Sequence, residues 1–271
     1  MSRYTVIGAT GFIGARVCER LAAKGAQVYA PRRGDPGLFD RDLGRVFYCA
    51  GLTGDYRDKP FEAVEAHVSF LARVLETARF EQLVYLSSTR LYDSLGGGVG
   101  REDRPLALDP NDPRHVYELS KALGENLALT QSGGRGAVAR LSYVFDWAEA
   151  GAGFLSEWLH AARRARAVTL DSSPSYARDY IHVDDVADAL TTMLDTGGAG
   201  LVNVASGRVL SNADLAEVFT ARGWTVTFQR PPAPQTTPAC DVSRLTALGV
   251  RARDPRALID AYLATLDAAG A

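Results

Sequence analysis

The segment "TVIGATGFIG" (residues 5–14) decides how the chain begins to fold. Its three glycines, Gly8, Gly11 and Gly14, stand three residues apart, after an apolar run and before a helical pattern that continues through Leu21. This order predicts a strand, a tight turn and a helix. Glycine permits positive φ in the turn and lets a pyrophosphate approach the backbone and the helix N-terminus. The segment therefore predicts a dinucleotide site, and the alternative is a tight turn that serves only close helix–sheet packing.

The rest of the chain alternates short β-type runs with amphipathic helical patterns, which is typical of a parallel sheet with crossover helices. Strands are predicted at residues 3–7, 26–30, 45–50, 82–87, 136–142 and 201–204, and helices near 12–24, 61–79, 115–131 and 184–195. A helix (211–222), a short strand (224–228) and a final helix from about residue 254 follow.

One spacing in this pattern is unusually short. Only fifteen residues separate Ala30 from Val46, which is too few for a full crossover helix and another strand. The predicted fold class is therefore α/β: a Rossmann-type doubly wound parallel sheet with a shortened second half-unit, its third strand missing or vestigial, and a small C-terminal substrate lobe.

The composition limits the kinds of partner that the chain can have. Its 271 residues are 46% apolar and 23% charged, with a net charge of −2, which argues against a nucleic-acid-binding surface. Cys18, Cys49 and Cys240 are scattered and odd in number, so neither a disulfide framework nor a metal site is predicted. Strand 3–7 leaves no room for a signal peptide, and no apolar run is long enough to span a membrane. We expect a cytoplasmic protein without a membrane partner.

Two arginines follow the second predicted strand, in "VYAPRRGD" (residues 28–35). In dinucleotide sites an acid at this place bonds the ribose hydroxyls of NAD, whereas a basic residue suits the 2′-phosphate of NADP. Arg32 and Arg33 stand there with no acid before them, and a guanidinium pair suits a phosphate. NADP is therefore the predicted cofactor and NAD the alternative. The other reading is a pair of exposed arginines at a strand end.

A tyrosine and a lysine in "HVYELSK" (residues 115–121) form the candidate catalytic pair. Tyr117 and Lys121 are four residues apart and so share one helical face. A cationic amine near a phenol lowers the phenol's pKa and makes it a usable acid or base. The alternative is an ordinary pair on a helix surface. Upstream, the run "LVYLSSTRLY" ends a predicted strand with hydroxyl side chains that could steady a carbonyl oxygen.

These motifs resemble the extended short-chain dehydrogenases/reductases that act on nucleotide sugars, and the resemblance covers nearly the whole chain. It also includes "RDYIHVDDVADAL" (178–190), "NVASGRVLSNADLAE" (203–217) and "CDVSRLTALGV" (240–250). The run "RDYIHVDDVA" is specific to the nucleotide-sugar branch. The resemblance implies a dinucleotide-binding domain over residues 1–140 plus about 178–205. It implies a nucleotide-sugar-binding lobe over about 141–177 plus 206–271.

The resemblance also implies a role for individual residues. Tyr117 matches the acid/base, Lys121 the residue that tunes it and holds the nicotinamide ribose, and Ser88 the hydroxyl that bonds the reacting oxygen. The implied cofactor site comprises Gly8, Thr10, Gly11, Phe12, Ile13, Gly14, Arg32, Arg33, Ala50, Tyr117 and Lys121. The implied substrate site comprises Ser88, Thr89, Tyr143, Arg178 and Arg230. The two arginines match residues that grip the substrate diphosphate, Arg230 more loosely, and both could instead be surface ion-pair partners.

Departures from the family pattern favour one reaction. Thr89 and Arg90 stand where nucleotide-sugar 4,6-dehydratases carry an Asp-Glu pair, so no local acid/base pair is left for eliminating water. Arg32 replaces the acid by which the epimerases hold NAD. Tyr143 takes the place of their asparagine, as in the dTDP-4-dehydrorhamnose reductases and related 4-ketoreductases.

We therefore expect an NADPH-dependent reductase of the 4-keto group of a nucleotide-diphosphate sugar. A 4-epimerase that works on retained NAD is the alternative. A non-catalytic NADP-binding sensor is less favoured because Ser88, Tyr117 and Lys121 are all present. By family analogy, a homodimer would form through the helices at 61–79 and 115–131.

Overall fold

The computed structural model describes residues 3–54, 56–147, 153–197, 200–235 and 237–269. Its centre is a six-stranded parallel sheet with the order β10-β6-β4-β3-β1-β2. The strands are β1 (Arg3–Ile7), β2 (Gln27–Tyr29), β3 (Arg45–Tyr48), β4 (Gln82–Ser88), β6 (Gly136–Leu141) and β10 (Leu201–Val204). The predicted α/β class is confirmed. Because the strands are parallel, the carboxyl ends of β1, β3 and β4 meet at one edge of the sheet, where open α/β folds bind ligands.

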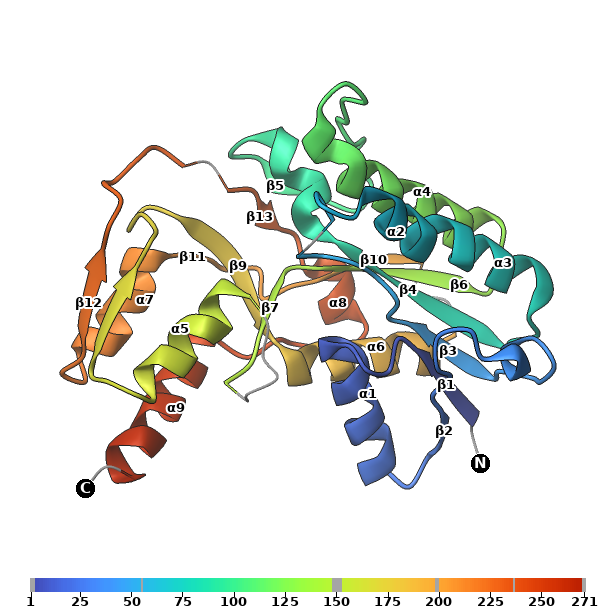
Figure 1. The fold of residues 1–271 in the computed structure, drawn as a ribbon, viewed down its shortest axis with the longest axis horizontal. Coiled ribbons are helices and arrows are strands. Elements are labelled where there is room, and N and C mark those ends of the chain that lie inside the picture. Colours follow the sequence, from blue (N-terminus) through green and yellow to red (C-terminus); the bar gives the residue numbers. More distant parts are fainter. Residues whose placement is uncertain (1–2, 55, 148–152, 198–199, 236, 270–271) are drawn as a thin grey trace.

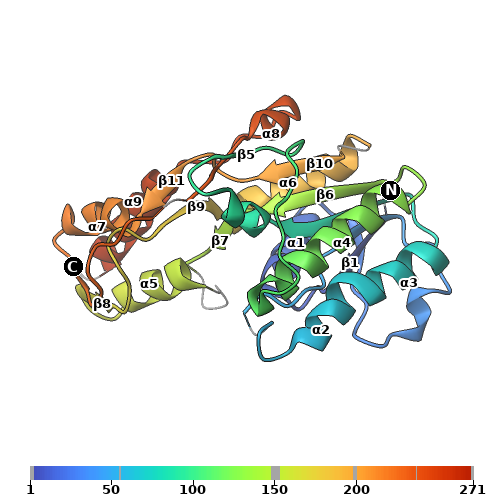
Figure 2. The same ribbon diagram turned by 90° about the horizontal axis from the view of Figure 1, so that it is seen from above.

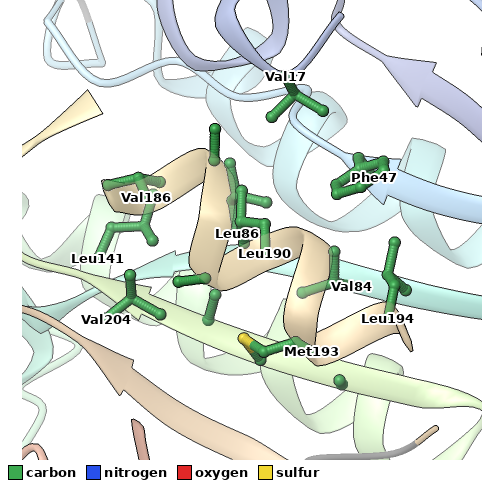
Figure 3. Close-up of a cluster of buried hydrophobic side chains, with 14 of the residues drawn as sticks. Val17, Phe47, Val84, Leu86, Leu141, Val186, Leu190, Met193, Leu194 and Val204 are labelled. Carbon is green, nitrogen blue, oxygen red and sulfur yellow. The ribbon is translucent and has the colours of Figure 1, made fainter. Parts of the chain in front are cut away.

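Helices cover both faces of this sheet (Figures 1 and 2). On one face lie α1 (Phe12–Ala23) and α6 (Val183–Asp195), and on the other α2 (Pro60–Val64), α3 (Phe70–Thr77) and α4 (Val116–Thr130). Figure 3 shows the apolar core on the side of α1 and α6, in which buried residues of α6 pack against the sheet. They include Val186, Leu190 and Met193, which cluster with Val84 and Leu86 of β4. Burial on both faces explains the apolar runs along the strands.

The connection from β2 to β3 is compact. Between these strands the described chain has only the 3-10 turn η1 (Pro36–Leu38), and β2 is the edge strand of the sheet. The Asp35 carboxylate fixes the turn, because it accepts hydrogen bonds from the Gly37 N–H (2.9 Å) and the Tyr29 hydroxyl (2.8 Å). No described residue forms a strand beyond β2.

The helix predicted at 61–79 contains a π-helical turn. It begins at Pro60 and ends at Thr77, and η2 (Glu65–Ser69) separates α2 from α3. Such a π-turn inserts one extra residue into an α-helix and is frequent at functional sites. Here the turn carries His67, whose side chain is fully buried.

A second group of elements lies on the left of Figure 1 and has its own apolar core. One sheet joins β7 (Tyr143–Phe145), β9 (Ala177–His182) and β11 (Val209–Ser211), and another joins β8 (Ala167–Leu170) to β12 (Thr225–Phe228). The helices here are α5 (Phe154–Ala162), α7 (Asn212–Thr220) and α9 (Pro255–Ala269). The strand predicted at 136–142 is therefore corrected: β6 ends at Leu141, and after Ser142 the chain enters a different sheet.

Short elements complete the described chain: β5 (Val99–Gly100), β13 (Ala239–Cys240), α8 (Ser243–Ala247), and the 3-10 turns η3 (Thr89–Leu95) and η4 (Pro113–His115). Within the described residues, no helix is long and apolar enough to cross a membrane. The same residues contain no group of three or more His, Cys, Asp or Glu side chains that could hold a metal ion.

Candidate active site

The glycine turn between β1 and α1 is packed too closely for side chains at two of its three positions. Gly8 has φ of 88°, and a Cβ there would lie 2.8 Å from the Ala50 backbone nitrogen. A Cβ on Gly14 would lie 2.2 Å from the Gly8 oxygen. Gly11 is the N-cap of α1 and supplies no side-chain cap, so the first N–H groups of the helix are left for another acceptor. The glycines at positions 8 and 14 thus allow close packing of the helix against the sheet, and the free N–H groups of α1 also suit a pyrophosphate.

The other predicted cofactor residues lie around this turn. Thr10 is exposed, Phe12 and Ile13 form the start of α1, and Ala50 follows β3. Arg32 and Arg33 are exposed beyond β2, and neither makes an ion pair or side-chain hydrogen bond with a described residue. Two guanidinium groups are therefore available to an anion at this edge of the sheet.

Tyr117, Lys121 and Ser88 come together at the carboxyl end of β4. Tyr117 lies in the first turn of α4 and is 3% exposed, and a hydrogen bond links it to Ser88 at the end of the strand. Lys121, one turn further along α4, is also buried, and its Nζ donates to the Leu86 carbonyl (2.8 Å). The predicted catalytic residues thus form one constellation.

The electrostatics of this constellation differ from the sequence-based expectation. Burial raises the pKa of Tyr117, and this outweighs the hydrogen bond from Ser88 and the charge of Arg90, both of which lower it. The prediction that Lys121 lowers this pKa toward neutrality is wrong here. Its Nζ is 5.9 Å from the Tyr117 ring centroid, whereas the Arg90 guanidinium carbon is 4.6 Å away. Burial lowers the pKa of Lys121 itself to about 7, although Glu125 acts to raise it.

A buried histidine, which the sequence analysis missed, supports the first turn of α4. His67 Nε2 accepts a hydrogen bond from the Leu52 N–H (3.1 Å), so the ring proton is on Nδ1, which donates to Ser120 Oγ (2.8 Å). Ser120 Oγ in turn donates to the Tyr117 carbonyl (2.9 Å). Burial, followed by the charge of Lys121, lowers the pKa of His67 to about 2, so the ring is neutral. A single histidine in an amphipathic pattern gives no sequence signal for this role.

Arg90 also belongs to the site, and it was identified in the sequence only as a departure from the dehydratase pattern. Its Nη2 donates to the Tyr56 hydroxyl (3.0 Å) and to Glu118 Oε1 (2.9 Å). Its backbone N–H donates to Ser88 Oγ (3.2 Å). The guanidinium lies over two rings, 5.0 Å from the Tyr56 centroid and 4.6 Å from that of Tyr117.

On the side of the second apolar core, Arg178 of β9 lies over two aromatic rings. Its guanidinium carbon is 5.0 Å from the Tyr143 ring centroid and 4.3 Å from that of Tyr176. Nη1 donates to the Ala177 carbonyl (2.8 Å), but Nε is buried and has no hydrogen-bond partner among the described residues. A half-buried cation with an unused donor suits a phosphate oxygen. Asp93 of η3, another residue that the sequence analysis missed, is near this cation; burial raises its pKa and the charge of Arg178 lowers it.

The two remaining predicted substrate residues are engaged elsewhere. Thr89 is buried and hydrogen-bonded to the Cys240 thiol. Arg230 is exposed and pairs with Asp171 through Nε (2.8 Å) and Nη2 (2.9 Å). Among the described residues, no contact joins Arg230 to Arg178. The surface ion pair considered for Arg230 is therefore present, and its role in binding stays a prediction.

Comparison with known proteins finds similarity over most of the chain. The model of the NAD dependent epimerase/dehydratase family matches residues 4–205. A dTDP-6-deoxy-L-talose 4-dehydrogenase (NAD(P)(+)) of Kitasatospora kifunensis is 29% identical over 254 residues, covering 80% of this chain and 78% of that protein. A dTDP-4-dehydro-6-deoxy-D-allose reductase of a Streptomyces species is 24% identical over 262 residues, covering 80% and 79%. The structure of MoeE5 in complex with UDP-glucose and NAD has the same fold, with a TM-score of 0.77, 24% identity and coverage of 95% and 96%.

Proposed function

Because the chain belongs to the NAD-dependent epimerase/dehydratase family, we propose that it reduces the 4-keto group of a nucleotide-diphosphate sugar with NADPH. The observation that carries the proposal is the grouping of Ser88, Tyr117 and Lys121 beside the carboxyl end of β4. Two curated relatives support the position of the reaction, since one is named a 4-dehydrogenase and the other a reductase of a 4-dehydro sugar, both on dTDP-deoxysugars.

The cofactor would lie against the glycine turn. The N–H groups at the start of α1 would bind its pyrophosphate, and Arg32 and Arg33 would bind the 2′-phosphate. NADPH would supply the hydride that reduces the sugar carbonyl. The absence of an acid before the two arginines, at the end of β2, favours NADPH over NADH, with NAD as the alternative cofactor.

The side chains of the site then have distinct tasks. The Ser88 hydroxyl hydrogen-bonds the sugar carbonyl oxygen, and the Tyr117 hydroxyl donates its proton to that oxygen as negative charge develops on it. Lys121 binds the nicotinamide ribose. Arg178 binds the sugar diphosphate beside Tyr143, and Arg230 is proposed as a weaker second contact to the same group.

We assign the contacts of Tyr143 and Arg230 to a lobe made of about residues 141–177 and 206–271, with Arg178 at its boundary in β9. Its apolar core, separate from those of the parallel sheet, supports this division. The cofactor would bind to the other domain, residues 1–140 plus about 178–205. We further propose a cytoplasmic homodimer that forms through α2 and α4. The side chains of Phe61 (87% exposed) and Leu123 (49% exposed) support this face as the interface.

The experiment is an NADPH-oxidation assay with a dTDP-4-dehydro-6-deoxyhexose. Tyr117→Phe keeps the ring and removes the proton, so kcat should fall by about 10²–10⁴-fold while NADPH binding is retained. Tyr262→Phe is the matched control, because this hydroxyl lies on α9 and accepts or donates no hydrogen bond within the described residues. Near-normal turnover by Tyr117→Phe would contradict the assignment.

The same assay separates the alternatives. A reductase consumes one NADPH for each sugar reduced. An epimerase interconverts two sugars without net consumption and is purified with NAD retained. A sensor binds NADP and turns over nothing.

A further inference from the structure

Arg90 is the cation nearest to the candidate acid, and it is held there from several sides. Its guanidinium carbon lies 4.6 Å from the Tyr117 ring centroid. The Tyr56 ring lies 5.0 Å away, and the rings of Tyr56 and Tyr117 are themselves 5.1 Å apart. Glu118, which is buried, accepts a hydrogen bond from Nη2. A long, flexible side chain is therefore fixed in one orientation over the phenol.

Holding Arg90 in place requires a buried carboxylate, and burying that charge costs hydration free energy that an apolar residue at this position would not cost. Glu118 is 4% exposed, and its second carboxylate oxygen, Oε2, finds no hydrogen-bond partner in the described part of the chain. Burying an ion pair yields little net stability, because the loss of hydration offsets most of the attraction. An apolar side chain would cover the two rings at a lower cost in free energy. This arrangement is better explained by what the positive charge does to Tyr117.

Other groups around Tyr117 cannot replace this charge. His67 lies edge-on to its ring at 5.4 Å and is neutral, and burial drives the Lys121 pKa down to about 7. The remaining titratable neighbours, Glu118, Tyr56 and Tyr85, are acids that supply no positive charge. Ser88 and Thr53 contribute only hydrogen bonds.

We propose that Arg90 is a positioning residue for Tyr117: its guanidinium, fixed by Tyr56 and Glu118, stabilises the phenolate that remains when Tyr117 has given up its proton. The inference rests on the proposed function. In the reduction, the hydride goes to the sugar carbon, the Tyr117 proton goes to the sugar oxygen, and the O–H electron pair stays on the phenol. A cation over the ring face stabilises that anion more than it stabilises the neutral phenol. Arg90 therefore acts on the product side of the proton transfer.

The test is a titration of phenolate absorbance in the protein alone, without cofactor or sugar. Subtracting the Tyr117→Phe curve from that of the unaltered protein isolates Tyr117 from the other ten tyrosines. The same subtraction is made between Arg90→Gln and the Arg90→Gln/Tyr117→Phe double variant. Glutamine can still donate to Glu118 and Tyr56 but carries no charge. We expect the Tyr117 midpoint to rise by about one pH unit or more in the Arg90→Gln background, the usual scale for a lost neighbouring charge.

Two further variants separate charge from packing. Arg90→Lys retains the charge and should hold the midpoint closer to that of the unaltered protein. Arg57→Met is the matched control, since Arg57 donates to the Tyr56 hydroxyl (3.2 Å) but makes no ring contact with Tyr117 among the described residues. Its Tyr117 midpoint should not move. Where Arg90→Gln does not fold, Arg90→Met, which covers the same two rings without a charge, replaces it.

An unchanged Tyr117 midpoint in a folded Arg90→Gln or Arg90→Met protein would overturn the proposal, as would an equal rise in Arg57→Met. Because the titration uses neither NADPH nor sugar, its outcome does not depend on the proposed reduction. That reduction fails separately, if the unaltered protein shows no turnover. If both hold, the Arg90→Gln variant should lose at least tenfold in kcat, with Arg90→Lys restoring part of it.

Discussion

The guanidinium of Arg178 has a hydrogen-bond donor that no described residue uses. Its guanidinium lies over the rings of Tyr143 and Tyr176, and this donor, Nε, is buried. We predict that Arg178→Ala weakens the binding of dTDP or UDP by about 1.5–3 kcal/mol, the scale of a hydrogen bond to a charged group. Titration calorimetry measures this. Arg164→Ala, an exposed arginine that follows α5, is the control, and equal affinities for both variants would rule out the diphosphate contact.

Lys121 gives the folded protein a specific pH dependence of stability. Its pKa is lowered to about 7 by burial, whereas an unfolded lysine titrates near about 10.4. Unfolding therefore takes up a proton between these values, so this residue makes the folded state gain stability as the pH rises through that window. We predict that Lys121→Met removes this gain. Urea unfolding of both proteins across the window measures it, and parallel curves of unfolding free energy against pH would contradict the lowered pKa.

Single residues could be predicted from the sequence where a short motif specifies both type and spacing. Tyr117 and Lys121 were found this way, because four residues along a helix place them on one face. The position of Arg90 could not be predicted. Its partners Tyr56 and Glu118 are 34 and 28 residues away along the chain, so only the packed structure brings them together. The error about the Tyr117 pKa has a similar cause, since burial by segments that are remote in the sequence decides the direction of its shift.

The close packing of the turn between β1 and α1 requires glycine at position 14 more strictly than at position 11. A Cβ on Gly14 would lie 2.2 Å from the Gly8 oxygen, whereas a Cβ on Gly11 would lie 3.4 Å from it. We predict that Gly14→Ala pushes α1 away from the strand and lowers the melting temperature of the unliganded protein by several degrees, as a core strain of about 1–3 kcal/mol would. Gly11→Ala is the matched control and should melt near the unaltered protein. Equal melting temperatures for the two variants would contradict this packing argument.

At the same scale, most elements with a regular apolar pattern could be predicted, and even the three-residue β2 lies within a predicted strand, but several short or polar strands could not be predicted. The buried apolar runs identified β1, β3, β4, β6 and β10, and 3.6-residue periodicity identified α1, α4 and α6. In contrast, β9 (Ala177–His182) contains arginine, aspartate and histidine, and β7 and β11 have three residues each. Such strands are specified by their pairing partners rather than by their own pattern. The π-turn was missed because its apolar periodicity still looks like that of one helix.

For the whole molecule, the apolar face of α2 and α4 gives a test of assembly. We predict that the protein is a homodimer and that Phe61→Glu combined with Leu123→Glu yields the 29.1 kDa monomer, because charges on this face cannot be buried in an apolar contact. Light scattering after size exclusion gives the molar mass. Val99→Glu, which alters an exposed apolar residue of β5, is the control. A double variant that stays dimeric would place the interface elsewhere.

The missing strand beyond β2 has a consequence for how such an enzyme can diversify. The sheet ends at β2, so Arg32 and Arg33 stand at its open margin, exposed and unpaired, where no neighbouring strand constrains them. Substitutions at Arg32 and Arg33 remove no buried side chain and break no ion pair among the described residues, whereas Leu38 and Leu43 of the same connection lie in the core. On the proposed binding of the 2′-phosphate by Arg32 and Arg33, the choice between the two coenzymes is separable from folding, and we expect exchange of these two residues to change coenzyme specificity without altering Ser88, Tyr117 or Lys121.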